Sequence, residues 1–218
     1  MTFIDIGAHY GLYALLASKK VGGSGKVIAF EPQNKLIPII QKNFFINDCG
    51  NATVIHSAVG ERMEMLTLFQ PSATNPGMAT LALDPTESHS EEVEQVPVDT
   101  LVNLLKNLDV EHIHGMKIDV EGAEYSVLRG AEPFFRKAEP HFLFIECIEQ
   151  NLNRFGHSCQ NVFTFLQDHG YRLIARRRNR WVTFTNSSEF REKTQASPDV
   201  IAIHPSTETW KKVNRLFQ

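Results

Sequence analysis

The chain has 218 residues, of which 42% are hydrophobic and 22% are charged, and its formal net charge is −3. This length fits one globular domain with a full core. The small negative charge gives no electrostatic reason to expect a nucleic acid or an anionic membrane as a partner. No apolar stretch is long enough to cross a bilayer, and residues 1–20 lack the pattern of a signal peptide.

The three cysteines, Cys49, Cys147 and Cys159, are an odd number and have no C-x-x-C spacing. This pattern favours neither a disulfide framework nor a zinc site. We therefore expect reduced thiols and a cytoplasmic protein.

Apolar runs typical of strands alternate with helical patterns over the first 60 residues. Strands are expected at 2–6, 26–31 and 51–59, and helices at 10–20 and 35–46. Such a β-α-β-α-β series implies a parallel sheet with right-handed crossovers.

The rest of the chain continues this alternation after a less regular middle. A β-rich insertion is expected at about 62–98, and a C-terminal strand and hairpin region at about 171–205, within a single domain that covers residues 1–218. Residues 186–197 have the composition of a polar loop. The further strands are expected at 65–69, 78–83, 92–98, 116–120, 141–148, 171–177, 180–185 and 199–205, and the further helices at 99–108, 122–137 and 159–170.

A short loop with two glycines, G-A-H-Y-G at 7–11, follows the first strand, which carries Asp5. Ligands of open α/β sheets bind beyond the carboxyl ends of the strands, so this loop is expected to form one wall of a binding site. It departs from the dinucleotide fingerprint G-x-G-x-x-G, because the His9 side chain would obstruct the approach of a pyrophosphate. The Asp5 carboxylate would also repel phosphate, so a nicotinamide oxidoreductase is disfavoured.

An acid at position 5 suits a cationic group instead. Glu31 ends the second strand, 31 − 11 = 20 positions after Gly11, where a ribose-binding acid is expected. S-adenosylmethionine combines an amino-acid ammonium with a nucleoside and meets both conditions. The alternative is that Asp5 only caps the following turn and Glu31 is a solvated strand end.

A second group of acids, Asp119, Glu121 and Glu124, follows the strand expected at 116–120. Asp119 and Glu121 are two positions apart, so they project to one face if the strand extends that far. Glu124 falls in the first turn of the next helix, where the dipole favours a carboxylate whatever its function.

Four motifs in this order resemble those of the FkbM family of S-adenosylmethionine-dependent methyltransferases: F-I-D-I-G-A-x-x-G-x-Y at 3–13, F-E-P at 30–32, S-A-V-G at 57–60, and K-I-D-V-E-G-A-E with V-L-x-G-A at 117–131. The resemblance implies the class I (Rossmann-like) methyltransferase fold, an α/β fold with helices on both faces. Its seven-stranded sheet is mostly parallel, with an antiparallel last strand. The implied activity is O-methylation of a hydroxyl of a sugar, a glycan or a secondary metabolite.

The resemblance also implies the cofactor-binding residues. Asp5, Gly7 and Gly11 would contact the methionine part of S-adenosylmethionine, Glu31 the ribose, and Ser57 and Ala58 the neighbourhood of adenine, while Asp119 would face the methyl donor and the acceptor. His9 and Tyr10 complete the loop. The family often has asparagine at the position of His9. For the segment that usually precedes the first strand and helps to cover the cofactor, we expect either a start upstream of Met1 or a cover supplied by another part of the protein.

A hydroxyl is a weak nucleophile, so methyl transfer to it calls for a general base. Asp119 and Glu121 are the first candidates, and Glu146 is a third, with a helix cap or a salt bridge as its alternative role. Clustered carboxylates also suit Mg²⁺, but no ligand geometry follows from the sequence and no metal site is assigned. Segment 70–95 and the region after Glu146 are expected to form the acceptor pocket.

Three alternatives stay open for the function: methyl transfer to nitrogen, a macromolecular acceptor, or a protein that binds the cofactor without turnover. Oligomeric state is not predicted. Two other motifs are interpreted as structural. H-I-H at 112–114 precedes its strand and so lies at the end of the sheet away from the cofactor, and R-R-R-N-R at 176–180 forms the polar tip of a hairpin.

Overall fold

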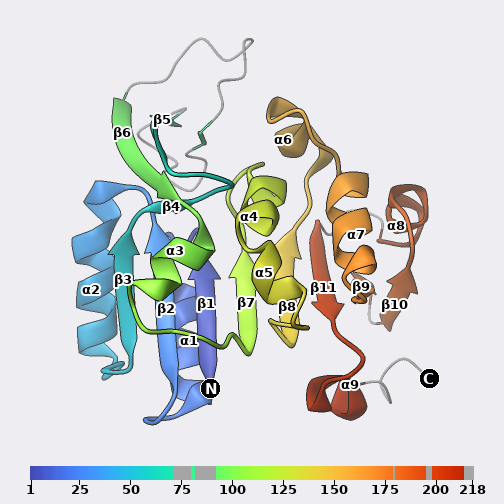
Figure 1. Cartoon of the computed structure of the whole chain (residues 1–218), viewed down its shortest axis with the longest axis horizontal. Coiled ribbons are helices and arrows are strands. Elements are labelled where there is room, and N and C mark those ends of the chain that lie inside the picture. The colour runs from blue at the N-terminus through green and yellow to red at the C-terminus, as the bar shows by residue number, and fades with distance from the viewer. Residues whose placement is uncertain (71–79, 82–91, 179, 195–197, 214–218) are drawn as a thin grey trace.

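A computed structural model describes residues 1–70, 80–81, 92–178, 180–194 and 198–213 (Figure 1). Most of the strand expected at 78–83 lies outside these ranges, as does the centre of the segment expected to shape the acceptor pocket. No helix in the ranges described has the length and apolar character that crossing a bilayer requires.

The centre of the described structure is one sheet of eight strands. These are β1 (Thr2–Ile6), β2 (Lys26–Glu31), β3 (Ala52–His56), β7 (Gly115–Ile118), β8 (Phe142–Glu146), β9 (Arg172–Arg177), β10 (Arg180–Phe184) and β11 (Asp199–Ile203). Their order across the sheet is β10-β9-β11-β8-β7-β1-β2-β3. The five strands from β8 to β3 run parallel, whereas β11 is antiparallel to both of its neighbours.

The expected number of seven strands is therefore wrong by one. The additional strand is β10, which pairs with β9 through the register Arg180↔Arg177 and extends the edge of the sheet. The antiparallel last strand of the expected fold is β11, which is inserted between β8 and β9.

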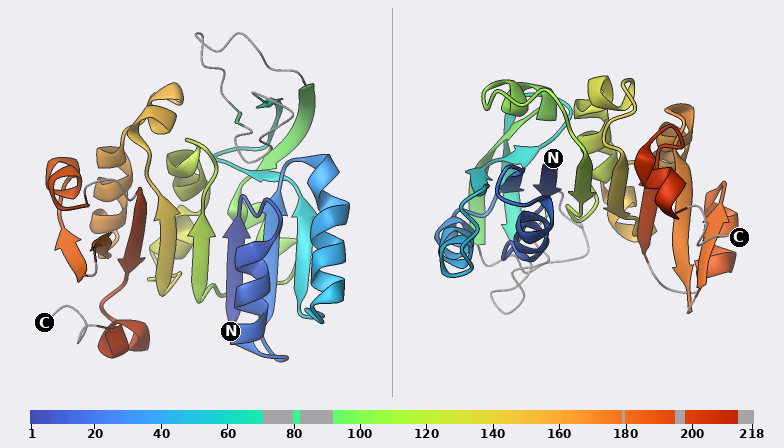
Figure 2. Two further views of the ribbon diagram at one scale, coloured as in Figure 1. Left: turned by 180° about the vertical axis from the view of Figure 1, so that it is seen from behind. Right: turned by 90° about the horizontal axis from the view of Figure 1, so that it is seen from below.

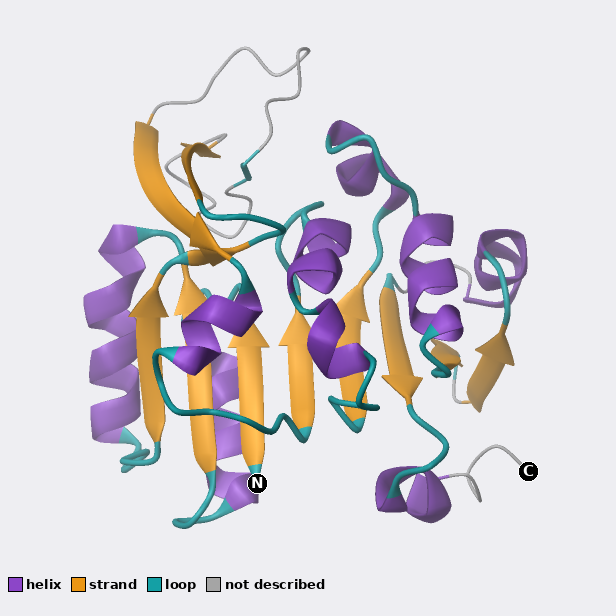
Figure 3. Ribbon diagram, viewed as in Figure 1, coloured by secondary structure: helices purple, strands orange, loops and turns teal. Residues whose placement is uncertain are grey.

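Helices cover both faces of the sheet (Figures 2 and 3). On one face α1 (Leu12–Val21) and α2 (Ile37–Ile46) pack against β1, β2 and β3. The opposite face carries α3 (Leu101–Lys106), α4 (Glu124–Gly130), α5 (Glu132–Phe135) and α7 (Cys159–Asp168). In β2, Val27 and Ala29 belong to the core under α1 and α2, and Ile28 and Phe30 to the larger core on the other side. This explains why the strand reads as a continuous apolar run.

A second, three-stranded sheet lies beyond the carboxyl ends of the parallel strands (Figure 1). It consists of β4 (Ala58–Val59), β6 (Glu92–Asp99) and β5 (Glu64–Gln70), in that order. The run expected as one strand at 51–59 is thus divided, since β3 ends at His56 and the chain then enters the second sheet. Thr80 forms an isolated bridge to Phe69 of β5.

The expected helices differ from the observed ones at four places. The helix expected at 122–137 is two helices, α4 and α5, and Pro133 stands in the first turn of the second. The polar segment expected as a loop contains α8 (Ser187–Thr194), whose Phe190 is buried against Phe163 and Phe184. Two short helices, α6 (Glu149–Arg154) and α9 (Glu208–Val213), were not expected.

Candidate active site

A cavity opens at the carboxyl ends of β1, β2 and β7, next to the second sheet. The cavity and its open mouth enclose about 740 Å³, which includes space open to solvent. Its lining residues come from the loops after four strands of the main sheet and from the second sheet. They are Ile6, Gly7, His9, Phe30, Glu31, Pro32, Gln33, Ser57, Ala58, Val59, Leu68, Leu81, Asp119, Val120, Glu121 and Ala123.

The glycine loop turns tightly from β1 into α1. The amide N–H groups of Gly7 and Ala8 both donate to the Phe30 carbonyl oxygen, at 3.0 and 3.1 Å, which ties the loop to β2. Gly7, His9 and Gly11 all have positive φ angles. Asparagine and histidine both tolerate this left-handed conformation better than most residues, so either residue fits at position 9.

The Glu31 carboxylate is held by main-chain donors on both sides. One oxygen accepts from the His9 N–H at 2.8 Å and the other from the Gln33 N–H at 2.9 Å. Only 2% of the residue is exposed, so Glu31 is not a solvated strand end. Burial raises its pKa to about 7, although both N–H donors act in the opposite direction. Its position in the cavity wall suits an acceptor for ribose hydroxyls.

Asp5 lies beneath the loop and not in the cavity wall. It is fully buried, and its Oδ2 accepts from the Ala14 N–H at 2.9 Å. Because α1 begins after Gly11 without a side-chain cap of its own, Asp5 caps this helix from the strand before it. Burial raises the Asp5 pKa, and the neighbouring ammonium of Lys117 opposes that effect. The geometry therefore supports the capping role, and a direct bond to a ligand ammonium stays a prediction.

Six of the residues predicted to bind the cofactor line the cavity, namely Gly7, His9, Glu31, Ser57, Ala58 and Asp119. Tyr10 and Gly11 lie outside the lining, like Asp5, and Tyr10 is 42% exposed. The Ser57 hydroxyl donates to the carbonyl oxygens of Ala58 and Pro97, which fixes the entry to the second sheet. His9 Nε2 is a buried atom without a hydrogen-bond partner in the described structure.

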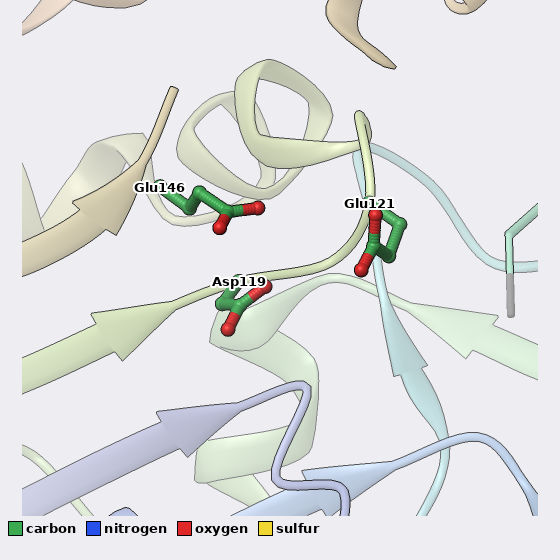
Figure 4. A group of neighbouring side chains, drawn as sticks. All are labelled: Asp119, Glu121 and Glu146. Carbon is green, nitrogen blue, oxygen red and sulfur yellow. The ribbon is translucent and has the colours of Figure 1, made fainter. Parts of the chain in front are cut away.

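The three predicted catalytic acids converge beside this cavity (Figure 4). Asp119, Glu121 and Glu146 each place one carboxylate oxygen within 4.8 Å of the others. Asp119 and Glu121 were expected to share one face of an extended strand. They instead come together through a turn, because β7 ends at Ile118 and Glu121 has a φ of 55°. The Asn151 amide donates to Glu121 Oε2 at 2.8 Å and holds this side chain in place.

Burial and the neighbouring acids raise the pKa values of two members of the cluster. Burial raises the pKa of Glu121 to about 7, and the Asp119 and Glu124 carboxylates add to the effect. Burial also raises the pKa of Glu146 to about 8, and Asp119 and Glu121 act in the same direction. Such values place the group where a general base works at neutral pH. Acidic clusters of this kind also occur without an ion, and we assign no metal to this one.

Glu124 has a structural role in the same region. Its Oε1 accepts from the N–H groups of Val120 and Gly122, both at 3.1 Å, so it closes the turn that carries Glu121. Gly122 is required there, because it has a φ of +113° and a Cβ atom would lie 2.4 Å from the Asn151 carbonyl oxygen.

Lys117 is a site residue that was not predicted from the sequence. It is a charged residue in the middle of β7, and only 3% of its side chain is exposed. Its ammonium lies 3.6 Å from Asp5 Oδ1 and 3.4 Å from Asp119 Oδ2. A lysine inside the apolar run M-K-I-D-V is the sequence signal that could have identified it, since lysine is rarely buried without a partner.

The sheet order, the glycine loop, the acid at the end of β2 and the acids after β7 together define the class I methyltransferase fold. Residues 5–173 match the family described as "Methyltransferase FkbM domain". The chain belongs to this family.

Related proteins agree with the assignment. "Methyltransferase 1" of Beauveria bassiana (strain ARSEF 2860) is 26% identical over 146 residues, which cover 59% of this chain and 57% of that protein. "Methyltransferase sdnD" of Sordaria araneosa is 26% identical over 157 residues, which cover 59% of this chain and 60% of that protein.

Among solved structures, the FkbM methyltransferase from Methylobacillus flagellatus KT has a TM-score of 0.54 and 16% identity, and the match covers 93% of this chain and 43% of that chain. This similarity supports the fold. The chain spans less than two thirds of the length of these three proteins, as the shares of 57%, 60% and 43% show.

Proposed function

We propose that the chain transfers a methyl group from S-adenosylmethionine to an oxygen nucleophile, a hydroxyl of a sugar, a glycan or a secondary metabolite. The observation that carries this proposal is the carboxylate cluster beside the cavity, which provides a base next to the place where a donor would lie. Membership of the FkbM family supports methyl transfer as the reaction.

The cavity residues fit the proposed cofactor. Glu31 would accept hydrogen bonds from the ribose hydroxyls, and Gly7 and His9 would border the methionine part. Ser57 and Ala58 would lie near the adenine, where Val59 and Leu68 offer apolar contacts. When bound, the cofactor supplies a methyl carbon that its sulfonium has already activated.

The chain has three tasks in this reaction. It aligns the acceptor oxygen with the methyl carbon, excludes water and removes the hydroxyl proton. With the cofactor bound, the acceptor oxygen would take the methyl group, and the electron pair of the broken carbon–sulfur bond would stay on the sulfur of S-adenosylhomocysteine. The hydroxyl proton moves to the carboxylate cluster. Because Asp119 is paired with Lys117, Glu121 and Glu146 are the proposed proton acceptors.

Two measurements test the proposal in sequence. Isothermal titration calorimetry with S-adenosylmethionine and S-adenosylhomocysteine should show binding of both, and the absence of both would contradict the proposal. Transfer of a radiolabelled methyl group should then be measured with pools of glycans, small hydroxylated metabolites, amines and proteins. Labelling of an amine or protein pool would favour the nitrogen or macromolecular alternative. Binding without any labelling would favour a cofactor-binding protein without turnover.

A further inference from the structure

Lys117 lies between the glycine loop and the carboxylate cluster. In the register of β1 and β7 it is the direct partner of Asp5, so the two side chains lie on the same face of the sheet. The Lys117 Nζ lies 5.5 Å from the centre of the Tyr13 ring, on the first turn of α1. The side chain is therefore enclosed between the sheet and this helix, and its charge is directed toward the carboxyl ends of the strands.

The ammonium has four oxygen neighbours from three segments. It donates to the Gly7 carbonyl oxygen at 2.6 Å and lies 3.5 Å from the Ile6 carbonyl oxygen. The carboxylate neighbours are Asp5, beneath the loop, and Asp119, at the edge of the cavity. The first three oxygens belong to β1 and its loop, and the fourth belongs to the carboxylate cluster.

We propose that Lys117 is the positioning residue of the methyl-transfer site, because its buried ammonium joins the turn of the glycine loop to the carboxylate of Asp119. This inference rests on the proposed function. Lys117 is absent from the cavity lining, so it acts through Gly7 and Asp119 and not by touching the ligand.

The charge of Lys117 has a second consequence for the ligand. Asp119 and Glu121 line the cavity in which a cationic sulfonium would lie, and transfer would convert that sulfonium into a neutral thioether. An ionised carboxylate there favours the charged cofactor over the neutral product. The buried Lys117 cation beside Asp119 reduces the difference, because interactions between charges are strong where water is excluded. Lys117 therefore brings the affinities for cofactor and product closer together.

Lys117→Met tests this, because methionine keeps the apolar stem and removes the ammonium. The ratio of the dissociation constant of S-adenosylhomocysteine to that of S-adenosylmethionine should rise about 5- to 30-fold, as expected for the loss of a nearby charge at an intermediate effective dielectric constant. Lys42→Met removes an exposed charge from α2 and should leave the ratio unchanged.

A second pair of variants keeps the test valid if Lys117→Met does not fold. Lys117→Met leaves Asp5 buried without its cation, which is costly, whereas Asp5→Asn combined with Lys117→Met replaces the pair by neutral groups of similar size. The double variant is compared with Asp5→Asn alone, so that only the ammonium differs. The same increase in the ratio is expected between these two proteins.

Carbon-13 NMR of glutamate carboxyl groups provides a readout that needs no ligand. The groups that face or couple to Lys117 are Asp5 on β1, Tyr13 on α1, His9 in the loop, Glu31 after β2 and Asp119 after β7. The Lys117 ammonium lowers the pKa of Glu31 from the value that burial alone would give. Removal of the ammonium should therefore raise the titration midpoint of Glu31. Without the ammonium, Asp119 loses its ion pair with Lys117. This should also shift the titration midpoints of Glu121 and Glu146, whose pKa values depend on Asp119.

The outcomes separate the two proposals. Unchanged midpoints and an unchanged affinity ratio in the double variant, relative to Asp5→Asn, would overturn the role of Lys117. Failure of the unmodified protein to bind either ligand would overturn the proposed function instead, and the NMR titration would still decide whether Lys117 controls the charges of the site.

Discussion

The main chain of Gly7 lies directly against the main-chain carbonyl of Asp119. Gly7 has a φ of +74°, and a Cβ atom at this position would lie 1.9 Å from the Asp119 oxygen. The glycine loop and the carboxylate cluster thus meet through two backbones, with no space for a side chain between them.

Gly7→Ala is expected to lower the free energy of unfolding by about 3 kcal/mol or more, because it combines backbone strain with overpacking. Gly156→Ala is a matched control, since Gly156 has a φ of +75° and, in the described part of the chain, a Cβ atom there would meet nothing within 4 Å. The control should cost only about 1 kcal/mol. Urea unfolding of both variants checks this, and equal losses would show that the contact with Asp119 is unimportant.

Glu31→Gln should weaken the binding of S-adenosylmethionine about 10- to 100-fold. The two N–H donors fix the carboxylate in the cavity wall, and hydrogen bonds to a charged group are worth about 1.5–3 kcal/mol. Calorimetry gives the affinity. Glu111→Gln, which changes an exposed acid at the amino end of β7, should bind normally. A change of less than about twofold in Glu31→Gln would argue against a role of this acid in binding.

Glu146→Gln should stabilise the protein more at pH 8.5 than at pH 5.5. The folded-state pKa of Glu146 is raised from 4.5 to about 8, so the folded state retains a proton that the unfolded state releases. The contribution of Glu146 to the free energy of unfolding is therefore full below about pH 4.5 and is lost as the pH rises toward 8. The gain should be about 1–2 kcal/mol at the higher pH, well below the full value of the shift, because the side chain is only half-buried. Urea unfolding at both pH values measures this gain, and equal gains would contradict the raised pKa of Glu146.

Methyl transfer should accelerate as the pH rises from 6 to about 8, because the proton acceptor must first lose its proton. Glu121 and Glu146 have pKa values of about 7 and about 8. The rate is measured with whichever acceptor the labelling identifies. Glu146→Gln should lower kcat about 100-fold, within the range of general-base catalysis, and leave the affinity for the cofactor nearly unchanged. Full activity in this variant would remove Glu146 from the mechanism.

Acid should destabilise the protein through His114. Its Nδ1 accepts a hydrogen bond from the Thr2 N–H at 3.1 Å, and a protonated ring cannot accept it. Burial lowers the His114 pKa below 6.5, so the unfolded state takes up a proton first. The stabilisation is complete above about pH 6.5 and is lost as the pH falls toward the folded-state pKa. His114→Gln keeps an acceptor without the titration, and its stability should therefore change less between pH 7 and pH 5 in thermal unfolding.

The sequence predicted the parts of the fold that depend on local patterns. The apolar runs at β1 and β2 gave the strand bounds. A strand was expected at 180–185, where β10 lies, but its place as an eighth strand of the main sheet was not, and α8 was not predicted. Residues 186–197 carry few apolar side chains, and the helix is stabilised by Phe190, whose partners lie elsewhere in the chain.

The site was predictable in the choice of acids and less so in their roles. Asp119, Glu121 and Glu146 converge, but a turn at Glu121 brings them together, and no pattern with a period of two encodes a φ of 55°. Asp5 was identified as a residue of interest, yet its buried position depends on Lys117, which lies 117 − 5 = 112 positions away and becomes its neighbour only through the pairing of β1 with β7. Contacts of this kind follow from strand order and not from local sequence.

The two halves of the proposed reaction are carried by separate parts of the chain. The loops that would hold the nucleoside lie within residues 7–58, whereas the acids that would serve the acceptor lie within residues 119–146. Within the main sheet the two parts meet along the junction of β1 with β7. If the proposed function holds, mutations after β8 would change which acceptor is used and leave the nucleoside part intact, so substrates could diversify on this sheet without a new donor site.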